Sequence, residues 1–133
     1  MVVKTFGLTH IALNVRDPER AFRFYESVLG CVEVYRGDDF IQAQTPGSRD
    51  VLVFQAHAGQ APGSSGGIAH FGFRLVAPDD IQTAEESVVA AGGRIVARGE
   101  FCPGEPYVFF TDPEGYTVEL WYELPTPVDP QAT

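Results

Sequence analysis

Two histidines occupy matching places in two similar stretches of the chain. His10 lies within GLTHIALNV (residues 7–15), and His70 lies within GGIAHFGFRL (residues 66–75). In both stretches, side chains of different character alternate, which is the period-two pattern of a β-strand, and each histidine falls on the less apolar face. Imidazole nitrogens are common ligands of divalent metals. A fold that brings the two strands together would place both histidines at one metal; the alternative is that each histidine is a hydrogen-bonded core residue.

A carboxylate near the end of the chain completes this set. In YTVELWYE (residues 116–123), Glu119 alternates with apolar neighbours and points away from them. Because helices cover the more apolar face of a sheet, we expect His10, His70 and Glu119 on the opposite, concave face. Two histidines and one carboxylate suit a divalent first-row metal and leave coordination positions open for substrate or water.

The elements that must position these residues follow a regular order. After the strand at residues 7–15 comes RDPERAFRFYESVLGC, in which Asp17 is a good helix N-cap and Gly30 a good C-terminal stop. Three short stretches with strand character follow, separated by turn residues: CVEVYRG, DDFIQAQT and RDVLVFQAH. The first part of the chain is therefore predicted to be a βαβββ module.

The same order returns after AGQAPGSSGG (residues 58–67), which has the composition of a flexible linker. We therefore predict an α+β fold of two tandem βαβββ modules, at residues 1–57 and 68–124. Together they are expected to form a curved mixed sheet or cleft with helices on its outer face. The proline-rich tail, residues 125–133, is expected to be flexible.

Composition limits the possible partners and location. The chain has 133 residues and a net charge of −9, which argues against nucleic-acid binding. No apolar run approaches the roughly 18 residues of a membrane span, and the first residues do not resemble a signal peptide. The two cysteines, Cys31 and Cys102, lack metal-site spacing. We expect a cytoplasmic protein with free thiols that acts on a small molecule.

Three segments together resemble the vicinal oxygen chelate superfamily, also called the glyoxalase/bleomycin resistance/dioxygenase superfamily. LTHIALNVRDPERAFRFYESVLG resembles its first β-α unit, GIAHFGFRL the strand that opens its second module, and FFTDPEGYTVEL its closing hairpin. The resemblance spans residues 6–123. It implies that His10, His70 and Glu119 bind a divalent metal such as Fe, Ni, Zn, Co or Mn. It also implies an enzyme whose substrate chelates this metal through vicinal oxygens.

The resemblance leaves the role of Gln55 open. Glyoxalase I and methylmalonyl-CoA epimerase add a Glu or Gln ligand from the last strand of the first module, which here is RDVLVFQAH. Either Val53 or Gln55 matches the position of Glu119. Gln55 is thus a fourth ligand, or it lies one step along the wall and touches substrate. By resemblance to the glyoxalases, Glu119 is also a catalytic base that loosens from the metal.

Departures from the family pattern separate the possible reactions. Extradiol ring-cleaving dioxygenases carry a tyrosine where Phe109 stands here, and a histidine further upstream that is missing; Tyr107 is the nearest substitute. We therefore favour lyase or isomerase chemistry over ring cleavage, which stays an alternative. Fosfomycin-resistance enzymes need a threonine where Ala12 stands. Bleomycin-binding members lack the ligand set, which this chain keeps, so an antibiotic- or metabolite-sequestering protein is the less favoured alternative.

Further residues are candidates for substrate contact. Arg74 either binds a substrate carboxylate or forms a surface ion pair. Aromatic residues on the concave face line the pocket or belong to the core. The full set of candidates is Gln55, Arg74, Tyr107, Phe109 and Trp121. We expect a homodimer, in which His10 and His70 meet either within one chain or across the interface.

Overall fold

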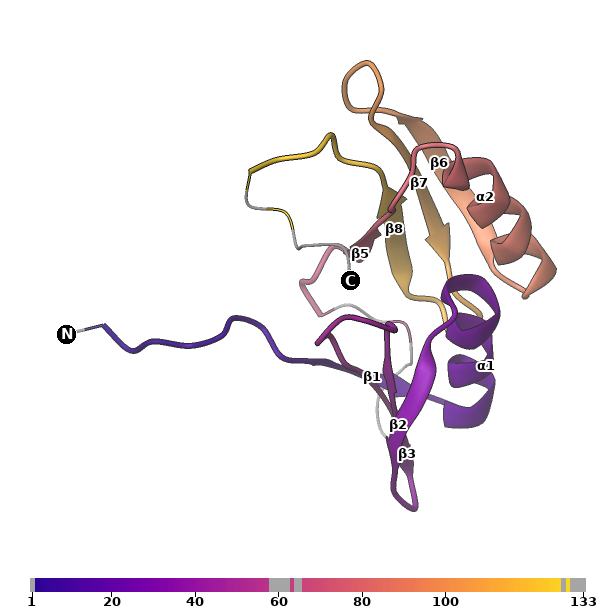
Figure 1. Ribbon diagram of the computed structural model, residues 1–133. Coiled ribbons are helices and arrows are strands. Elements are labelled where there is room, and N and C mark those ends of the chain that lie inside the picture. The colour runs from indigo at the N-terminus through magenta and orange to yellow at the C-terminus, as the bar shows by residue number, and fades with distance from the viewer. Residues whose placement is uncertain (1, 58–62, 64–65, 128, 130–133) are drawn as a thin grey trace. The chain divides into compact units, whose positions relative to one another are not determined.

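The computed structural model describes residues 2–57, 63, 66–127 and 129 (Figure 1). The chain divides into two compact units, Met1–Gln60 and Ala61–Thr133. This division falls inside the predicted linker, most of which lies outside the described residues, as do residues 128 and 130–133 of the predicted tail. The module limits chosen from the sequence therefore stay a prediction, and each unit is described by itself.

The first unit has the predicted order of one strand, one helix and three strands. Its sheet has the strand order β1-β4-β3-β2, in which β1 pairs parallel with β4 and the other neighbours are antiparallel. The elements are β1 (Ile11–Val15), α1 (Pro18–Leu29), β2 (Val32–Arg36), β3 (Phe40–Gln44) and β4 (Leu52–Ala56).

The limits of α1 follow from its capping residues. Asp17 Oδ1 accepts a hydrogen bond from the Arg20 N–H at 3.2 Å, which satisfies one of the free donors of the first turn. Gly30 ends the helix with φ of 70°, a left-handed conformation that glycine adopts without strain. Tyr25 is fully buried and stacks on Phe54 of β4, with ring centroids 5.2 Å apart. The helix is thereby fixed to one face of its sheet.

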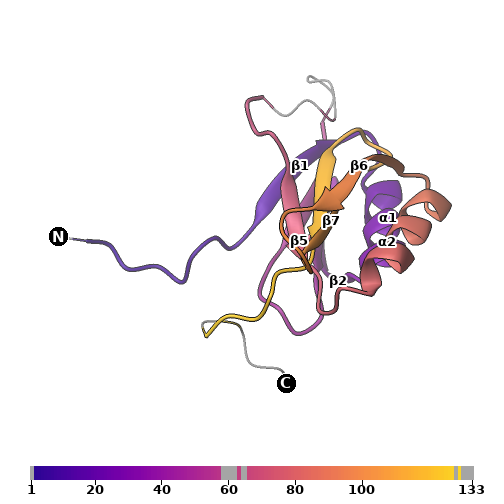
Figure 2. The ribbon, with the colours of Figure 1, turned by 90° about the horizontal axis from the view of Figure 1, so that it is seen from above.

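The second unit repeats this architecture. Its sheet has the order β5-β8-β7-β6, again with one parallel pair, β5 with β8. Even the register irregularities of β2 and β6 occur at matching places. In each unit the helix lies along one face of its own sheet (Figure 2). The elements are β5 (Phe71–Arg74), α2 (Asp80–Ala90), β6 (Arg94–Glu100), β7 (Pro106–Thr111) and β8 (Thr117–Trp121).

The predicted α+β fold of two βαβββ modules is thus confirmed. One detail differs, because His10 and His70 were expected inside strands. The hydrogen-bonded strands begin one residue later, at Ile11 and Phe71. Side-chain alternation continues beyond the paired part of a strand, so the sequence pattern does not mark where pairing starts.

A tight turn fixes the hairpin of β7 and β8. Asp112 is buried, and its Oδ1 accepts hydrogen bonds from the N–H groups of Glu114 at 3.0 Å and Tyr116 at 2.9 Å. The Gly115 N–H donates to the Asp112 carbonyl at 2.9 Å, which closes the turn predicted from DPEG. The turn sets the register of the two strands, which places Phe109 opposite Glu119.

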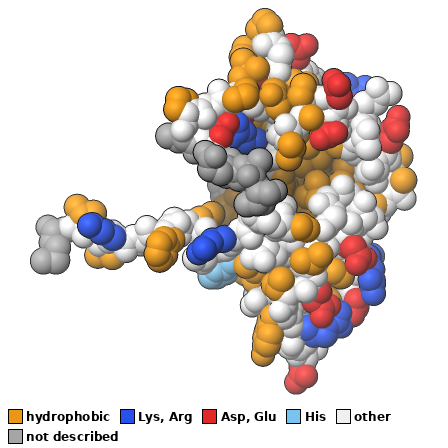
Figure 3. All heavy atoms as spheres, in the orientation of Figure 1, with side chains coloured by type: hydrophobic (Ala, Val, Ile, Leu, Met, Phe, Trp, Pro, Cys, Tyr) orange, Lys and Arg blue, Asp and Glu red, His pale blue; other side chains and the backbone are white. Residues whose placement is uncertain are grey.

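Acidic and basic side chains gather over α1 (Figure 3). Arg36 pairs with Glu19 and Glu33, and Arg23 pairs with Glu26 at 3.0 Å. This mixture of charges is not the basic stripe that binds phosphate backbones. Among the described residues, no helix is long and apolar enough to cross a membrane.

Candidate metal and substrate site

The pairing of β8 with its neighbours gathers most of the predicted site on one face of the second unit. Glu119 is paired with Gly72 of β5 and with Phe109 of β7. Paired residues of neighbouring strands share a face, and so do alternate residues of one strand. The face therefore carries the five candidates predicted for this module, with His70 immediately before β5: Arg74, Tyr107, Phe109, Glu119 and Trp121.

His70 and Glu119 approach each other closely. The His70 Nε2 and Glu119 Oε1 atoms are 3.8 Å apart, which is too far for a hydrogen bond. Neighbouring ligands of an ion with bonds of about 2.1 Å stand roughly 3.0–3.4 Å apart, so a small rotation of the imidazole reaches this spacing. The His70 ring meets the Phe109 ring edge to face at 4.9 Å, which braces it beside the carboxylate.

Gly72 provides the space that Glu119 occupies. A Cβ atom at Gly72 would lie 3.0 Å from the Glu119 carbonyl oxygen, 3.3 Å from its Cβ and 3.5 Å from Oε1. In the first unit, the corresponding position is Ala12, which is paired with Val53. The position thus carries a methyl group in the first unit, where its partner Val53 is apolar. It carries no side chain in the second unit, where its partner is Glu119. This close fit, together with one imidazole and one carboxylate, suits a divalent metal.

Aromatic rings extend this face towards β6. Phe101 stacks on Tyr107 with centroids 4.3 Å apart and meets Trp121 edge to face at 5.9 Å. The Tyr107 hydroxyl lies over β6, where a Cβ at Gly99 would be 2.8 Å from its oxygen. It therefore points away from Glu119, which is on the other side of β7. Phe101 was not among the predicted candidates, because the strand predicted for residues 94–101 was not assigned to the site face; in the structure it directly follows β6.

Arg74 is engaged in ion pairs. Its guanidinium contacts Asp129 (Nη1 to Oδ1 2.6 Å, Nη2 to Oδ2 2.9 Å) and the Glu123 carboxylate (Nε to Oε2 3.2 Å). The hydrogen bond with Asp129 raises the pKa of Arg74, and the guanidinium holds the pKa of Asp129 well below its usual range. Of the two predicted roles, the structure has the ion pair. Its partner, Asp129, comes from the segment that was expected to be flexible.

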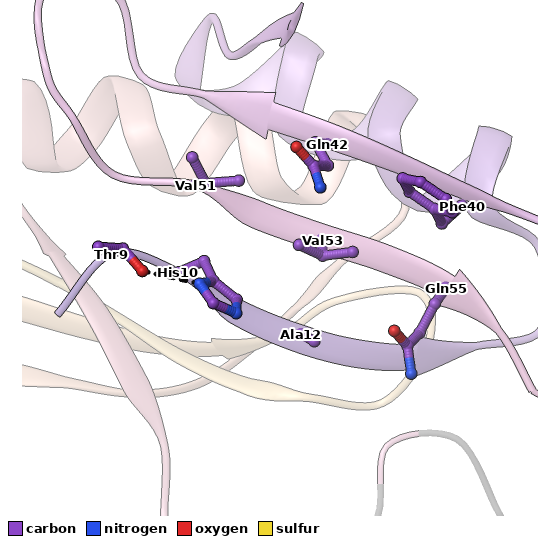
Figure 4. Close-up of a pocket in the computed structure, with 8 residues that line it drawn as sticks. All are labelled: Thr9, His10, Ala12, Phe40, Gln42, Val51, Val53 and Gln55. Carbon is purple, nitrogen blue, oxygen red and sulfur yellow. Dashed lines mark hydrogen bonds between the residues drawn. The ribbon is translucent and has the colours of Figure 1, made fainter. Parts of the chain in front are cut away.

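The first unit contributes a hollow of about 380 Å³ (Figure 4). His10 lies at its edge, where Nδ1 forms a hydrogen bond with the Thr9 hydroxyl at 2.8 Å. In the tautomer whose Nδ1–H donates to Thr9, the Nε2 lone pair is available to a metal. The lining comes from β1, β3, β4 and the residues that precede β1 and β4: Thr9, His10, Ala12, Phe40, Gln42, Val51, Val53 and Gln55.

The register of β1 and β4 favours one of the two roles predicted for Gln55. Ala12 pairs with Val53 just as Gly72 pairs with Glu119, so Val53 is the counterpart of Glu119. Gln55 is one step further along, and its Nε2 donates a hydrogen bond to Asn14 Oδ1 at 3.0 Å. This position corresponds to that of Trp121 and suits a residue of the pocket wall better than a fourth ligand.

Two of the three predicted ligands lie in the second unit, and His10 lies in the first. Within either unit, the described residues contain no group of three or more His, Cys, Asp or Glu side chains that could hold a metal. A site with all three ligands would need residues of both units.

Comparison with known proteins now places the chain. The sequence model of the Glyoxalase/Bleomycin resistance protein/Dioxygenase superfamily matches residues 7–120. The chain belongs to this superfamily. The membership predicted from the three sequence segments is thereby confirmed.

Relatives within the glyoxalase/dioxygenase superfamily differ in function. The uncharacterized protein PA2024 of Pseudomonas aeruginosa is 31% identical and covers 89% of both chains. A manganese-dependent 2,3-dihydroxybiphenyl 1,2-dioxygenase of Geobacillus genomosp. 3 is 27% identical over 97% of this chain and 40% of its own length. A probable chloroplastic lactoylglutathione lyase of Arabidopsis thaliana is 29% identical over 90% of this chain and 37% of its own length. The chain thus spans less than half of these last two proteins.

A solved structure within the superfamily has the same fold. The glyoxalase-related enzyme from Fulvimarina pelagi superposes with a TM-score of 0.76 at 22% identity, over 97% of this chain and 98% of the other. This agreement concerns the fold, so the reaction of this superfamily member has to be argued from its own residues.

Proposed function

We propose that the chain is a metal-dependent enzyme in which His10, His70 and Glu119 bind one divalent ion. The main support for this proposal is the 3.8 Å distance between His70 Nε2 and Glu119 Oε1, with Glu119 lying in the space that Gly72 leaves free. His10 supports it, because it immediately precedes the strand of the first unit that corresponds to β5. A set of two histidines and one carboxylate leaves positions open for a chelating substrate.

The bound ion would act as a Lewis acid on two vicinal oxygens of the substrate and stabilise the negative charge that develops there. Phe109 packs against His70 and excludes water from one side of the imidazole. Ala12 has a small side chain, so a ligand can lie close to β1, whereas the space beside Gly72 is filled by Glu119. Glu119, whose side chain is only 12% exposed, would accept a substrate proton on its carboxylate oxygen.

Lyase or isomerase chemistry is the reaction type that we propose first. Ring cleavage by the extradiol route would need a hydroxyl group at the position of Phe109, whose phenyl ring has none. The nearest phenol, Tyr107, directs its hydroxyl over Gly99. A proton transfer by Glu119 needs neither group. The relationship to a probable lactoylglutathione lyase is consistent with this choice.

Ring-cleaving oxygenation is the second candidate, because Val53 is the counterpart of Glu119. With Val53 there, the proposed ligand set contains three residues, as in the 2-His-1-carboxylate sites of non-haem iron oxygenases. The relationship to a manganese-dependent dioxygenase is consistent with it. Oxygen uptake with catechols would support this candidate, whereas isomerisation of thiol adducts of 2-oxoaldehydes, or epimerisation, would support the first.

Calorimetric titration with Mn²⁺, after bound metal has been removed with a chelator, tests the proposed site. We expect the wild-type protein to bind one equivalent, and His10→Ala, His70→Ala and Glu119→Gln to bind more than about 100-fold less tightly, because losing a ligand exceeds the cost of losing an outer-shell partner. His57→Ala is the matched control, since His57 follows β4 and is not a proposed ligand. Unchanged affinity in His70→Ala would contradict the proposal. Tight binding of an aromatic metabolite without metal or turnover would instead favour a sequestering protein.

A further inference from the structure

Arg74 lies on the face of the second unit that carries His70 and Glu119. Positions 70, 72 and 74 alternate along one strand, so His70 and Arg74 are about 13 Å apart along the chain direction. Trp121 is the partner of Arg74 in the β5–β8 pairing, as Glu119 is the partner of Gly72. The face thus has the proposed metal ligands at one end, and the Arg74 guanidinium beside the Trp121 indole at the other.

The Arg74 guanidinium already holds a carboxylate. Two of its nitrogens contact the two oxygens of Asp129, at 2.6 Å and 2.9 Å. This two-point geometry is the one in which arginine binds carboxylates most specifically. Its Nε, which takes no part in that contact, forms an ion pair with Glu123 Oε2 at 3.2 Å, which helps to orient the guanidinium. The arrangement is a preformed site for one carboxylate.

Hydrogen bonds between Thr126 and Asp129 hold the Asp129 carboxylate in position. Asp129 Oδ2 accepts the Thr126 N–H at 2.9 Å, Oδ1 accepts the Thr126 hydroxyl at 2.8 Å, and the Asp129 N–H donates to the Thr126 carbonyl at 3.2 Å. Thr126 and Asp129 thus hold each other in position, and from there Asp129 contacts Arg74 of β5. The Arg74 side chain is still one-third exposed, and a second carboxylate can therefore approach it from solvent.

We propose that Arg74 is the carboxylate-binding subsite of this enzyme, that its ligands are aromatic carboxylates, and that Asp129 occupies it until such a ligand displaces it. The aromatic part of the ligand follows from the rings beside the guanidinium, since Trp121 pairs with Arg74 and Phe101 packs against both Trp121 and Tyr107. The identity of this ligand as the substrate depends on the proposed function; its binding to Arg74 does not.

The short stretch of chain that joins Asp129 to β8 makes the subsite selective among carboxylates. Asp129 follows Trp121 by eight positions in the sequence, and a group on so short a tether competes at an effective concentration on the order of millimolar. A small carboxylate without an aromatic group competes poorly against it. A ligand that also stacks on the aromatic rings, or chelates the metal, gains the extra affinity that displacement needs.

The fluorescence of Trp121 tests this proposal directly, because it is the one tryptophan of the sequence and lies beside Arg74. The probes are phenylacetate and its neutral counterpart phenylacetamide, titrated into the full-length protein as purified. We expect Asp129→Asn to bind phenylacetate about tenfold more tightly than the wild-type protein, as expected for freeing a charge-assisted hydrogen-bonding site. The affinity for phenylacetamide should not change.

Two further variants complete the design. Arg74→Gln, alone or combined with Asp129→Asn, should abolish the preference for phenylacetate over phenylacetamide. Arg98→Gln is the matched control, because Arg98 is paired with Glu85 at 2.7 Å and should leave the preference intact. The proposal is wrong if Asp129→Asn binds phenylacetate no better than the wild-type protein, or binds both probes equally or not at all. Any binding to the metal would persist in Arg74→Gln, so the result is independent of the Mn²⁺ titration.

Discussion

At the scale of single residues, the smallest side chains decide what the site can hold. Gly72 and Ala12 occupy corresponding positions and differ by one methyl group, and their partners are Glu119 and Val53. A Cβ at residue 72 would press on the Glu119 backbone at 3.0 Å, and backbone cannot rotate away as a flexible side chain can. The position of Glu119 therefore requires that residue 72 on the neighbouring strand β5 has no side chain.

We predict that Gly72→Ala weakens Mn²⁺ binding at least about tenfold, because Glu119 must shift, and that it costs about 1–3 kcal/mol of stability through overpacking. Calorimetry and urea unfolding measure the two effects. Ala12→Gly is the control and should keep the wild-type affinity for the metal. Equal affinities of Gly72→Ala and the wild-type protein would show that the position of Glu119 does not matter.

The two cysteines, buried Cys31 and exposed Cys102, should differ in their rate of reaction with thiol reagents. Burial raises the pKa of Cys31 from 9.0 to about 11, so the unfolded chain loses this proton first and stability declines as the pH rises through that interval. Cys102 is exposed, although its hydrogen bond to Glu105 also raises its pKa. At pH 8 we expect a thiol reagent to modify Cys102 slowly, and Cys31 only after unfolding. Equal rates for the two thiols in the native protein would contradict the burial of Cys31.

At the scale of elements, the two helices begin differently. Asp17 caps α1 through its side chain, whereas Asp79, the first residue before α2, forms no capping hydrogen bond with any described residue. We expect Asp17→Ala to lower stability by about 0.5–2 kcal/mol and Asp79→Ala to have a much smaller effect. Urea unfolding of both variants provides the comparison. A larger loss in Asp79→Ala would mean that capping does not explain where these helices start.

The elements also show what the sequence could predict. The limits of α1 could be predicted from the sequence, because Asp17 and Gly30 cap the helix through contacts with residues close to them in the chain. The role of Gln55 was left open, since it depends on the register between β1 and β4, strands that are far apart in the sequence. The pairing of Arg74 with Asp129 was not predicted, because it joins residues 55 positions apart and the composition of the tail indicates disorder.

At the scale of the whole molecule, we predict a homodimer. In each unit one sheet face packs against the helix and the other carries the candidate site, and units this small bury little surface alone. Light scattering should give twice the 14.5 kDa mass of one chain. A monomer at all concentrations would contradict this expectation.

If the protein is a dimer, mixing variants tests whether the proposed ligands His10 and His70 come from one chain or two. If His10 and His70 of one site come from different chains, mixing His10→Ala with His70→Ala restores one metal site in each mixed dimer. If they come from the same chain, mixing restores none. Either result refines the proposed site without altering its ligands.

The proposed function depends on one claim, that a divalent ion is bound by histidines from both modules. Elemental mass spectrometry of protein purified without a histidine tag, beside His70→Ala and the control His57→Ala, tests it most directly. We predict about one equivalent of metal in the wild-type protein and in His57→Ala, and a loss in His70→Ala. Equal metal content in all three proteins, or none in the wild-type protein even after metal is added back, would contradict the claim.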